Sequence, residues 1–80
     1  MQERVTTEEI LSIRPGRRKL FYLRTAEAIR SARATAYQMP RRHPRKGVIR
    51  YACYTGRADK QAQIYPIVIK AIPPGEYEDI

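Results

Sequence analysis

The chain has 80 residues, a mass of 9.3 kDa, a formal net charge of +8 and a pI near 10.2. A chain of this length forms one small domain whose core contributes roughly 3–5 kcal/mol, which excludes a two-domain enzyme or a deep cofactor cleft. Its apolar runs are too short to cross a bilayer, and no apolar stretch follows Met1, so we expect a cytoplasmic protein. One cysteine, Cys53, and one histidine, His43, cannot together hold zinc, and we expect neither a metal nor a cofactor.

The positive charges are concentrated in the middle of the chain. Between Ile10 and Gly75 there are fifteen basic residues and only two acids, Glu27 and Asp59. Twelve of the sixteen cations in the chain are arginines, whose planar guanidinium groups suit phosphates and guanine edges. This pattern favours a polyanionic partner, above all a nucleic acid. The alternatives are an ordinary solvated surface, an anionic lipid or an acidic protein.

The first third of the chain contains a clear helix start. Thr6 and Glu9 have the spacing of a capping box, and Val5 and Ile10 that of a hydrophobic staple. They predict a short helix over residues 7–13, which ends at a turn formed by residues 14–16. The apolar run 20–23 then predicts a short strand covered on both faces, although four residues leave a helix open.

A longer helix is predicted over residues 26–39. Thr25 can cap it, and Pro40 is expected to end it. The helical repeat places one set of residues on the core side: Ala28, Ile29, Ala32, Ala36 and Met39. The opposite side carries a stripe formed by Arg30, Arg33 and Tyr37.

Residues 40–47 contain two prolines, which predict an extended, exposed arm. The arm holds four cations: Arg41, Arg42, Arg45 and Lys46. Basic extensions of this kind lie along phosphates or enter a minor groove. The turn before the first strand has a similar composition and contributes Arg17, Arg18 and Lys19.

The last third is predicted to be a β-hairpin, with strands over 48–55 and from residue 61 or 62 to 72, and a loop over 56–60. Pro66 removes a backbone donor from the second strand and suggests a sheet edge or a bulge. Residues 73–75 end the strand, and the acidic residues 76–80 are expected to be a flexible tail. One domain therefore spans residues 1–75.

Together these elements predict an α+β fold: a short helix, a strand, one main helix and a C-terminal β-hairpin in a three-stranded sheet. The first two strands would be parallel and joined by the main helix, with the last strand antiparallel, either between them or at an edge. A winged-helix variant, with the hairpin as wing, is the alternative architecture.

Catalysis is not expected. Two acids in the body of the chain offer little material for a hydrolase or a magnesium-dependent nuclease, and no glycine-rich phosphate loop is present. The tyrosines suggest a binding function. Tyr51 and Tyr54 should point to opposite faces of the sheet, so one can be buried while the other is exposed. Whichever is exposed, beside Arg50, could stack on the bases of a single strand.

The most consistent function is non-catalytic nucleic-acid binding, with duplex DNA favoured over RNA and a nucleoid-associated location. If about 5–7 phosphates are contacted, log K should fall by about 4–6 units per decade of salt. Size, basicity and layout are similar to small accessory proteins of phages and mobile elements, such as excisionases and integrase arm-binding domains. That similarity is one of layout and charge and transfers no residues. The candidate contacts are Arg17, Arg18, Lys19, Arg30, Arg33, Tyr37, Arg41, Arg42, Arg45, Lys46, Arg50 and Arg57.

Two other functions remain open. One is an RNA-binding or ribosome-associated module that uses the tyrosines of the sheet. The other is a structural or protein-interaction module that forms a homodimer through the edge of the last strand, its charge serving solubility.

Overall fold

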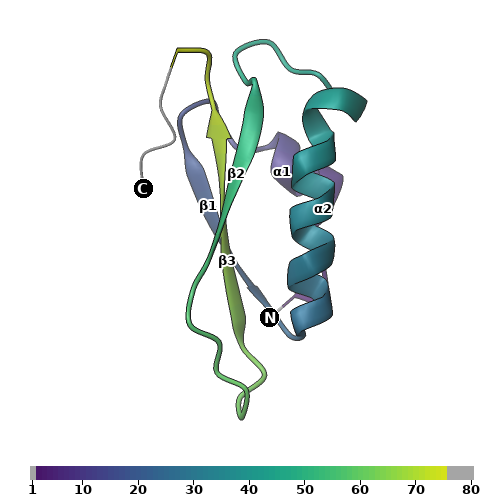
Figure 1. The fold of residues 1–80 in the computed structure, drawn as a ribbon, viewed down its shortest axis with the longest axis vertical. Coiled ribbons are helices and arrows are strands. Elements are labelled where there is room, and N and C mark those ends of the chain that lie inside the picture. Colours follow the sequence, from purple (N-terminus) through teal and green to yellow (C-terminus); the bar gives the residue numbers. More distant parts are fainter. Residues whose placement is uncertain (1, 76–80) are drawn as a thin grey trace.

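The fold was analysed in a computed structural model, which describes residues 2–75 (Figure 1). The elements are α1 (Thr7–Leu11), β1 (Arg18–Leu23), α2 (Ala26–Arg42), β2 (Arg50–Thr55) and β3 (Tyr65–Ile72). The strands form one antiparallel sheet in the order β1-β3-β2. The α+β fold predicted from the sequence is confirmed, with β3 between the other two strands. The predicted acidic tail, residues 76–80, lies outside the described residues.

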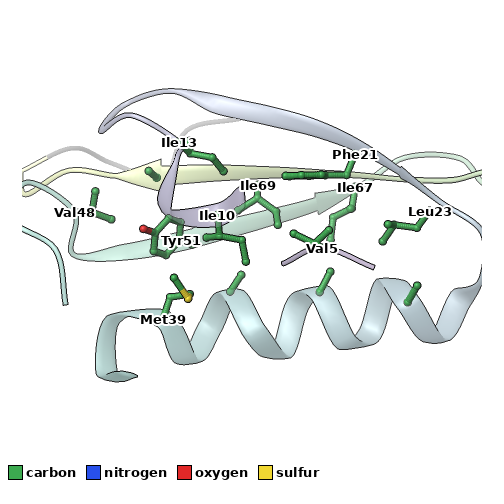
Figure 2. Packing of buried hydrophobic residues seen from close by; sticks show 14 residues of the cluster. Val5, Ile10, Ile13, Phe21, Leu23, Met39, Val48, Tyr51, Ile67 and Ile69 are labelled. Carbon is green, nitrogen blue, oxygen red and sulfur yellow. The ribbon is translucent and has the colours of Figure 1, made fainter. Parts of the chain in front are cut away.

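The core is a single layer of side chains between the sheet and the helices (Figure 2). Alternate residues of β3, Ile67, Ile69 and Ala71, are buried on the side of α2. The helix packs closely because most of its buried residues are alanines: Ala28, Ala32 and Ala36, with Met39 filling the far end. The predicted core face of α2 is confirmed, with Ile29 at its margin and only partly buried.

Helix α1 begins as predicted. The Thr6 backbone N–H donates to Glu9 Oε1 at 3.1 Å, and the Glu9 backbone N–H donates to Thr6 Oγ1 at 3.2 Å. The helix ends at Leu11, two residues before the predicted end. The turn that follows is closed by the Arg17 N–H, which donates to the Arg14 carbonyl at 2.9 Å. Gly16 takes a φ of 80° there, which only glycine adopts without strain.

The predicted end of the main helix at Pro40 is wrong, because α2 continues to Arg42. A proline costs most inside a helix, where it removes a hydrogen bond in the middle of the ladder. Pro40 lies in the last turn, where two features hold the chain. Met39 is buried in the core, and the His43 N–H donates to the Met39 carbonyl at 2.7 Å.

The extended arm predicted over residues 40–47 is also wrong. Its first three residues belong to α2, and the remainder turns back on itself, since Arg45 forms an isolated β-bridge with Val48. Val48 is buried in the core, which pins this turn to the body of the domain. The prolines were compatible with a turn as well as with an extended segment, and burial of Val48 selects the turn.

The strands differ from the prediction at their ends. β1 is an edge strand covered on one face only, not on both, and it leaves Leu20 and Tyr22 47% and 49% exposed on the other. β3 begins at Tyr65, so the loop spans residues 56–64 and is longer than expected. Its tip is closed by two hydrogen bonds between the backbones of Asp59 and Ile64, at 2.8 and 2.9 Å.

Pro66 lies in the central strand, so an edge position is wrong. Its carbonyl accepts from the Gly56 N–H at 3.2 Å, one residue beyond the end of β2. In an extended strand the backbone N and C=O of one residue face the same neighbouring strand. The nitrogen of Pro66, which carries no hydrogen, therefore also faces the chain beyond the end of β2. Gly56 makes the arrangement possible, because a Cβ there would lie 2.9 Å from Pro66 Cγ. A homodimer through the edge of β3 is excluded in this fold, since both edges of β3 are paired.

Candidate nucleic-acid interface

One flank of α2 carries a row of basic side chains. With about 100° per residue, Arg33, Tyr37, Arg30 and Arg41 follow one another around the side of the helix next to β2. Arg30 and Arg41 are exposed, and Tyr37 is 58% exposed. We call these four residues the basic stripe. The predicted stripe is thus extended by one residue, Arg41, because α2 does not end at Pro40.

Arg33 lies where α2 meets β2 and is partly buried. Its Nη2 donates to Thr55 Oγ1 at 3.4 Å, and its Nε is buried with no hydrogen-bond partner in the part of the chain that the structure describes. Arg33 also lies near Cys53. Burial raises the pKa of the Cys53 thiol to about 11, and the positive charge of Arg33 acts in the opposite direction. The thiol is therefore protonated at neutral pH, which fits a packing role and not that of a nucleophile.

A cleft of about 310 Å³ lies between the first half of α2 and the base of the hairpin. We call it the α2–hairpin cleft. Arg30 and Arg33 line it from the helix, and Tyr65 and Pro66 line it from β3. The remaining lining residues are Ala26, Ile29, Thr55, Gly56 and Ala58. The cleft therefore combines two guanidinium groups with an apolar wall.

The hairpin loop extends past the sheet at the end of the molecule where α2 begins (Figure 1). It carries two exposed cations, Arg57 and Lys60. Both lie close to Gly56 and Ala58, the loop residues that line the cleft. The loop therefore places positive charge near the end of the basic stripe that borders the cleft. Lys60 and Tyr65 were not among the predicted contacts, because the sequence does not show which loop and strand residues lie beside α2.

Three of the predicted contacts lie elsewhere. Arg18 and Lys19 begin β1, the edge strand opposite β2, and Arg17 directly precedes it. Arg18 pairs with Lys70 across the β1–β3 ladder. Lys19 Nζ lies 5.4 Å from the centroid of the Phe21 ring, within the range of a cation–π contact. These three cations are therefore separate from the basic stripe.

Arg45 has a structural role. Its Nη1 donates to the Ile13 carbonyl at 2.7 Å and to Tyr51 Oη at 3.1 Å, so it ties the segment after α1 to the buried tyrosine of β2. We therefore leave it out of the candidate interface. Arg42 and Lys46 are exposed beyond the stripe, at the C-terminal end of α2, and Arg50 is partly buried at the start of β2.

The two tyrosines of β2 point to opposite faces, as predicted. Tyr51 is buried in the core beside Met39 (Figure 2). Tyr54 is only partly exposed on the other face, and its hydroxyl oxygen is buried without a partner. Within residues 2–75 the most exposed aromatic ring on that face is Tyr22, another tyrosine of a predicted strand.

Comparison of the chain with protein-family models, curated proteins and solved structures finds no match. Within residues 2–75, neither helix is long and apolar enough to cross a membrane.

Proposed function

We propose that this protein is a non-catalytic nucleic-acid-binding protein that binds duplex DNA through the basic stripe, with the hairpin loop as a second contact. The observation that carries the proposal is the arrangement of Arg30, Arg33 and Arg41 along one flank of α2. Within residues 26–42 the single acid, Glu27, lies one turn before Arg30 on the α1 side of the stripe, and it borders a hollow that it shares with Glu3, Arg4 and Ser31. The four residues of the stripe itself include three cations and no acid.

The dimensions and side chains of α2 suit a DNA groove. Its 17 residues form a helix about 25 Å long. The major groove of B-DNA is about 12 Å wide and admits an α-helix. The exposed Ala26 and Ala34 beside the stripe are short, so the backbone can approach the groove while the arginines reach phosphates and guanine edges. Small accessory proteins of phages and mobile elements are similar to this chain in size, charge and layout, and duplex binding would place the protein at the nucleoid.

Neutralisation of phosphates supplies most of the affinity in this proposal. The cations on the α2 side are Arg30, Arg33, Arg41, Arg57 and Lys60, and each can release condensed counterions from a phosphate. Binding therefore weakens steeply with salt. Arg33, the least exposed of the stripe arginines, is the one best placed to distinguish base sequence from backbone, because its guanidinium group is held by packing.

The test compares Arg33→Ala with wild type on a selected target duplex and on random-sequence duplex, by fluorescence anisotropy. A larger loss on the selected target is expected if α2 enters a groove. Equal losses on both duplexes would reduce α2 to a backbone contact. Arg4→Ala, which removes the same charge from the opposite flank of α2, is the matched control, and it should change neither affinity. An equal loss in Arg4→Ala would overturn the proposal that the stripe is the interface.

A second candidate function is binding of single-stranded RNA on the face of the sheet away from the helices. Leu20 and Tyr22 are half exposed there, next to the cation Arg18 on the same strand face. Exposed aromatic rings stack on unpaired bases. Competition between duplex DNA and a single-stranded RNA of the same charge separates the two functions. Preference for RNA, lost in Tyr22→Ser, would favour the sheet.

A further inference from the structure

We propose that the α2–hairpin cleft is a binding site for one nucleotide, whose phosphate group is held by Arg30 and Arg33 and whose ring packs against Tyr65. This inference does not depend on duplex binding, because a single nucleotide in solution would suffice. The two share Arg30 and Arg33, so the test must separate them.

The first argument is the state of the Arg33 guanidinium group. Among residues 2–75 its Nε is buried without a hydrogen-bond partner, and the hydrogen bond that its Nη2 donates to Thr55 Oγ1 is long at 3.4 Å. A buried donor with no partner is unfavourable, and a charged donor more so. The protein thus leaves the Arg33 guanidinium group poorly satisfied, and an anion in the cleft that Arg33 lines would supply acceptors to its Nη donors.

The lining of the cleft also favours an anion over a neutral or positively charged ligand. The nine residues that line the cleft include two arginines and no carboxylate. Arginine binds phosphate oxygens through parallel N–H donors, which gives this pair of side chains more specificity for phosphate than for a halide ion. The hydroxyl of Thr55 lies on the same wall and adds a further polar group.

The third argument is the apolar wall opposite the arginines. Tyr65 and Pro66 form it from β3, and Ile29 adds apolar surface from the helix side. Tyr65 and Ile29 are partly buried against the core, so their positions are fixed. The volume of about 310 Å³ is at the lower end of the range for small-ligand sites, which is about 300–1,000 Å³. A phosphate group joined to one flat ring system matches this combination of charge, apolar surface and size.

The shape of the cleft is built into the backbone. The Pro66 ring packs against Gly56, where a Cβ would lie 2.9 Å from Pro66 Cγ, and the Gly56 N–H is engaged by the Pro66 carbonyl. This contact holds the base of the hairpin against β3 and keeps the floor of the cleft in place. The site is therefore largely preformed, which reduces the entropy lost on binding.

The experiment is a titration of the ¹⁵N-labelled protein with AMP, adenosine and inorganic phosphate, followed by NMR. AMP should shift the amide signals of Arg33, Thr55 and Gly56, and should bind more tightly than either adenosine or phosphate alone. Arg33→Ala should weaken AMP binding roughly tenfold or more, because a charge-assisted hydrogen bond is lost. Arg33→Lys, which keeps the charge without the planar fork, should recover only part of the affinity.

Two further variants separate the cleft from the stripe. Ala58 is exposed and lines the cleft, so Ala58→Phe should fill the cleft and weaken AMP binding while both arginines remain. Arg4→Ala, on the other flank of α2, should bind AMP as wild type does. Equal affinity for AMP and adenosine, or wild-type AMP binding by Ala58→Phe, would overturn the proposal.

The source of the nucleotide is distinguished with short single strands that carry either a 5′-phosphate or a 5′-hydroxyl. Tighter binding of the 5′-phosphate form indicates a strand end in the cleft, and binding of AMP alone indicates a free nucleotide. Duplex binding is measured on the same samples. If the wild-type protein binds duplex but not AMP, the cleft site is rejected and duplex binding stands. If it binds AMP but not duplex, duplex binding is rejected and the cleft site stands.

Discussion

The two flanks of α2 differ in charge and in the way their polar groups are used. The flank beside β2 carries the basic stripe, and its arginines make few contacts within the protein. The flank beside α1 carries Ser31 and Thr35, which border a hollow shared with Arg4, Thr6 and Glu8. On that side the polar groups of α1 are engaged with one another, as in the capping box formed by Thr6 and Glu9.

This difference separates stability from binding within one small domain. Charge that served solubility alone would be spread evenly over both flanks, whereas three of the four cations of α2, Arg30, Arg33 and Arg41, lie on the flank away from α1. Side chains on the α1 flank and in the core beneath α1 stabilise the fold. We therefore expect substitutions on the two flanks to have different consequences, and the following predictions test that separation.

The largest effect is expected on the basic stripe. The triple variant Arg30→Ala/Arg33→Ala/Arg41→Ala should lower duplex affinity by roughly 100-fold or more at low salt, since three phosphate contacts are removed. Fluorescence anisotropy measures the affinity. The thermal midpoint should stay close to that of wild type, because Arg30 and Arg41 are exposed and Arg33 makes only one long hydrogen bond.

Arg45→Ala should have the opposite profile. Loss of the hydrogen bonds to the Ile13 carbonyl and Tyr51 Oη leaves two partly buried acceptors unpaired, and should lower the free energy of unfolding by about 1–3 kcal/mol. Urea denaturation measures this loss. Lys46→Ala, an exposed neighbour, is the control and should fall within about 0.5 kcal/mol of wild type. Similar stabilities for the two variants would contradict a structural role for Arg45.

Thr6→Ala should destabilise the α1 flank without changing DNA binding. The substitution removes the side-chain half of the capping box and should lower the free energy of unfolding by about 1 kcal/mol. Thr6→Ser keeps the acceptor and should restore most of the stability. Weaker duplex binding by folded Thr6→Ala would show that the two flanks are not separate.

The smallest expected effect is on the pH dependence of the free energy of unfolding. Burial tends to raise the pKa of Glu9, but hydrogen bonds from Thr6 and Gln2, with the charge of Lys19, outweigh it and hold that pKa below its ordinary value of 4.5. The unfolded chain therefore binds this proton more readily than the folded chain. The contribution of Glu9 is present above pH 4.5 and is lost as the pH falls through the lower pKa of the folded protein.

Glu9→Gln should accordingly reduce the difference in stability between pH 7 and pH 3, measured by urea denaturation. The exposed Glu8→Gln variant is the control and should keep the wild-type difference. A wild-type pH dependence in Glu9→Gln would show that other carboxyl groups govern the acid response.

Local signals in the sequence predicted the elements well. The capping box at Thr6 and Glu9, the turn at Gly16 and the alanine face of α2 all depend on residues a few positions apart, and all are present. The errors fall where long-range packing decides. Pro40 stays in the helix because Met39 is buried, and Pro66 stays in the central strand because Gly56 makes room for its ring.

The candidate site could be predicted only in part. The helical repeat located Arg30, Arg33 and Tyr37 on one side of α2, and the structure places them there together with Arg41. The predicted contacts do not share one surface, since Arg18 and Lys19 lie on the far edge strand and Arg17 directly precedes it. The cleft could not be predicted, because it depends on which residues of β3 meet α2 in the folded chain.

The most direct test of the central claim is the salt dependence of duplex affinity for wild type and the triple stripe variant. Five cations on the α2 side predict that log K for wild type falls by about 4–5 units per decade of salt, and by about 2 for the variant. A wild-type slope near −1, or the same slope for both proteins, would contradict the assignment of the stripe as the DNA-binding surface.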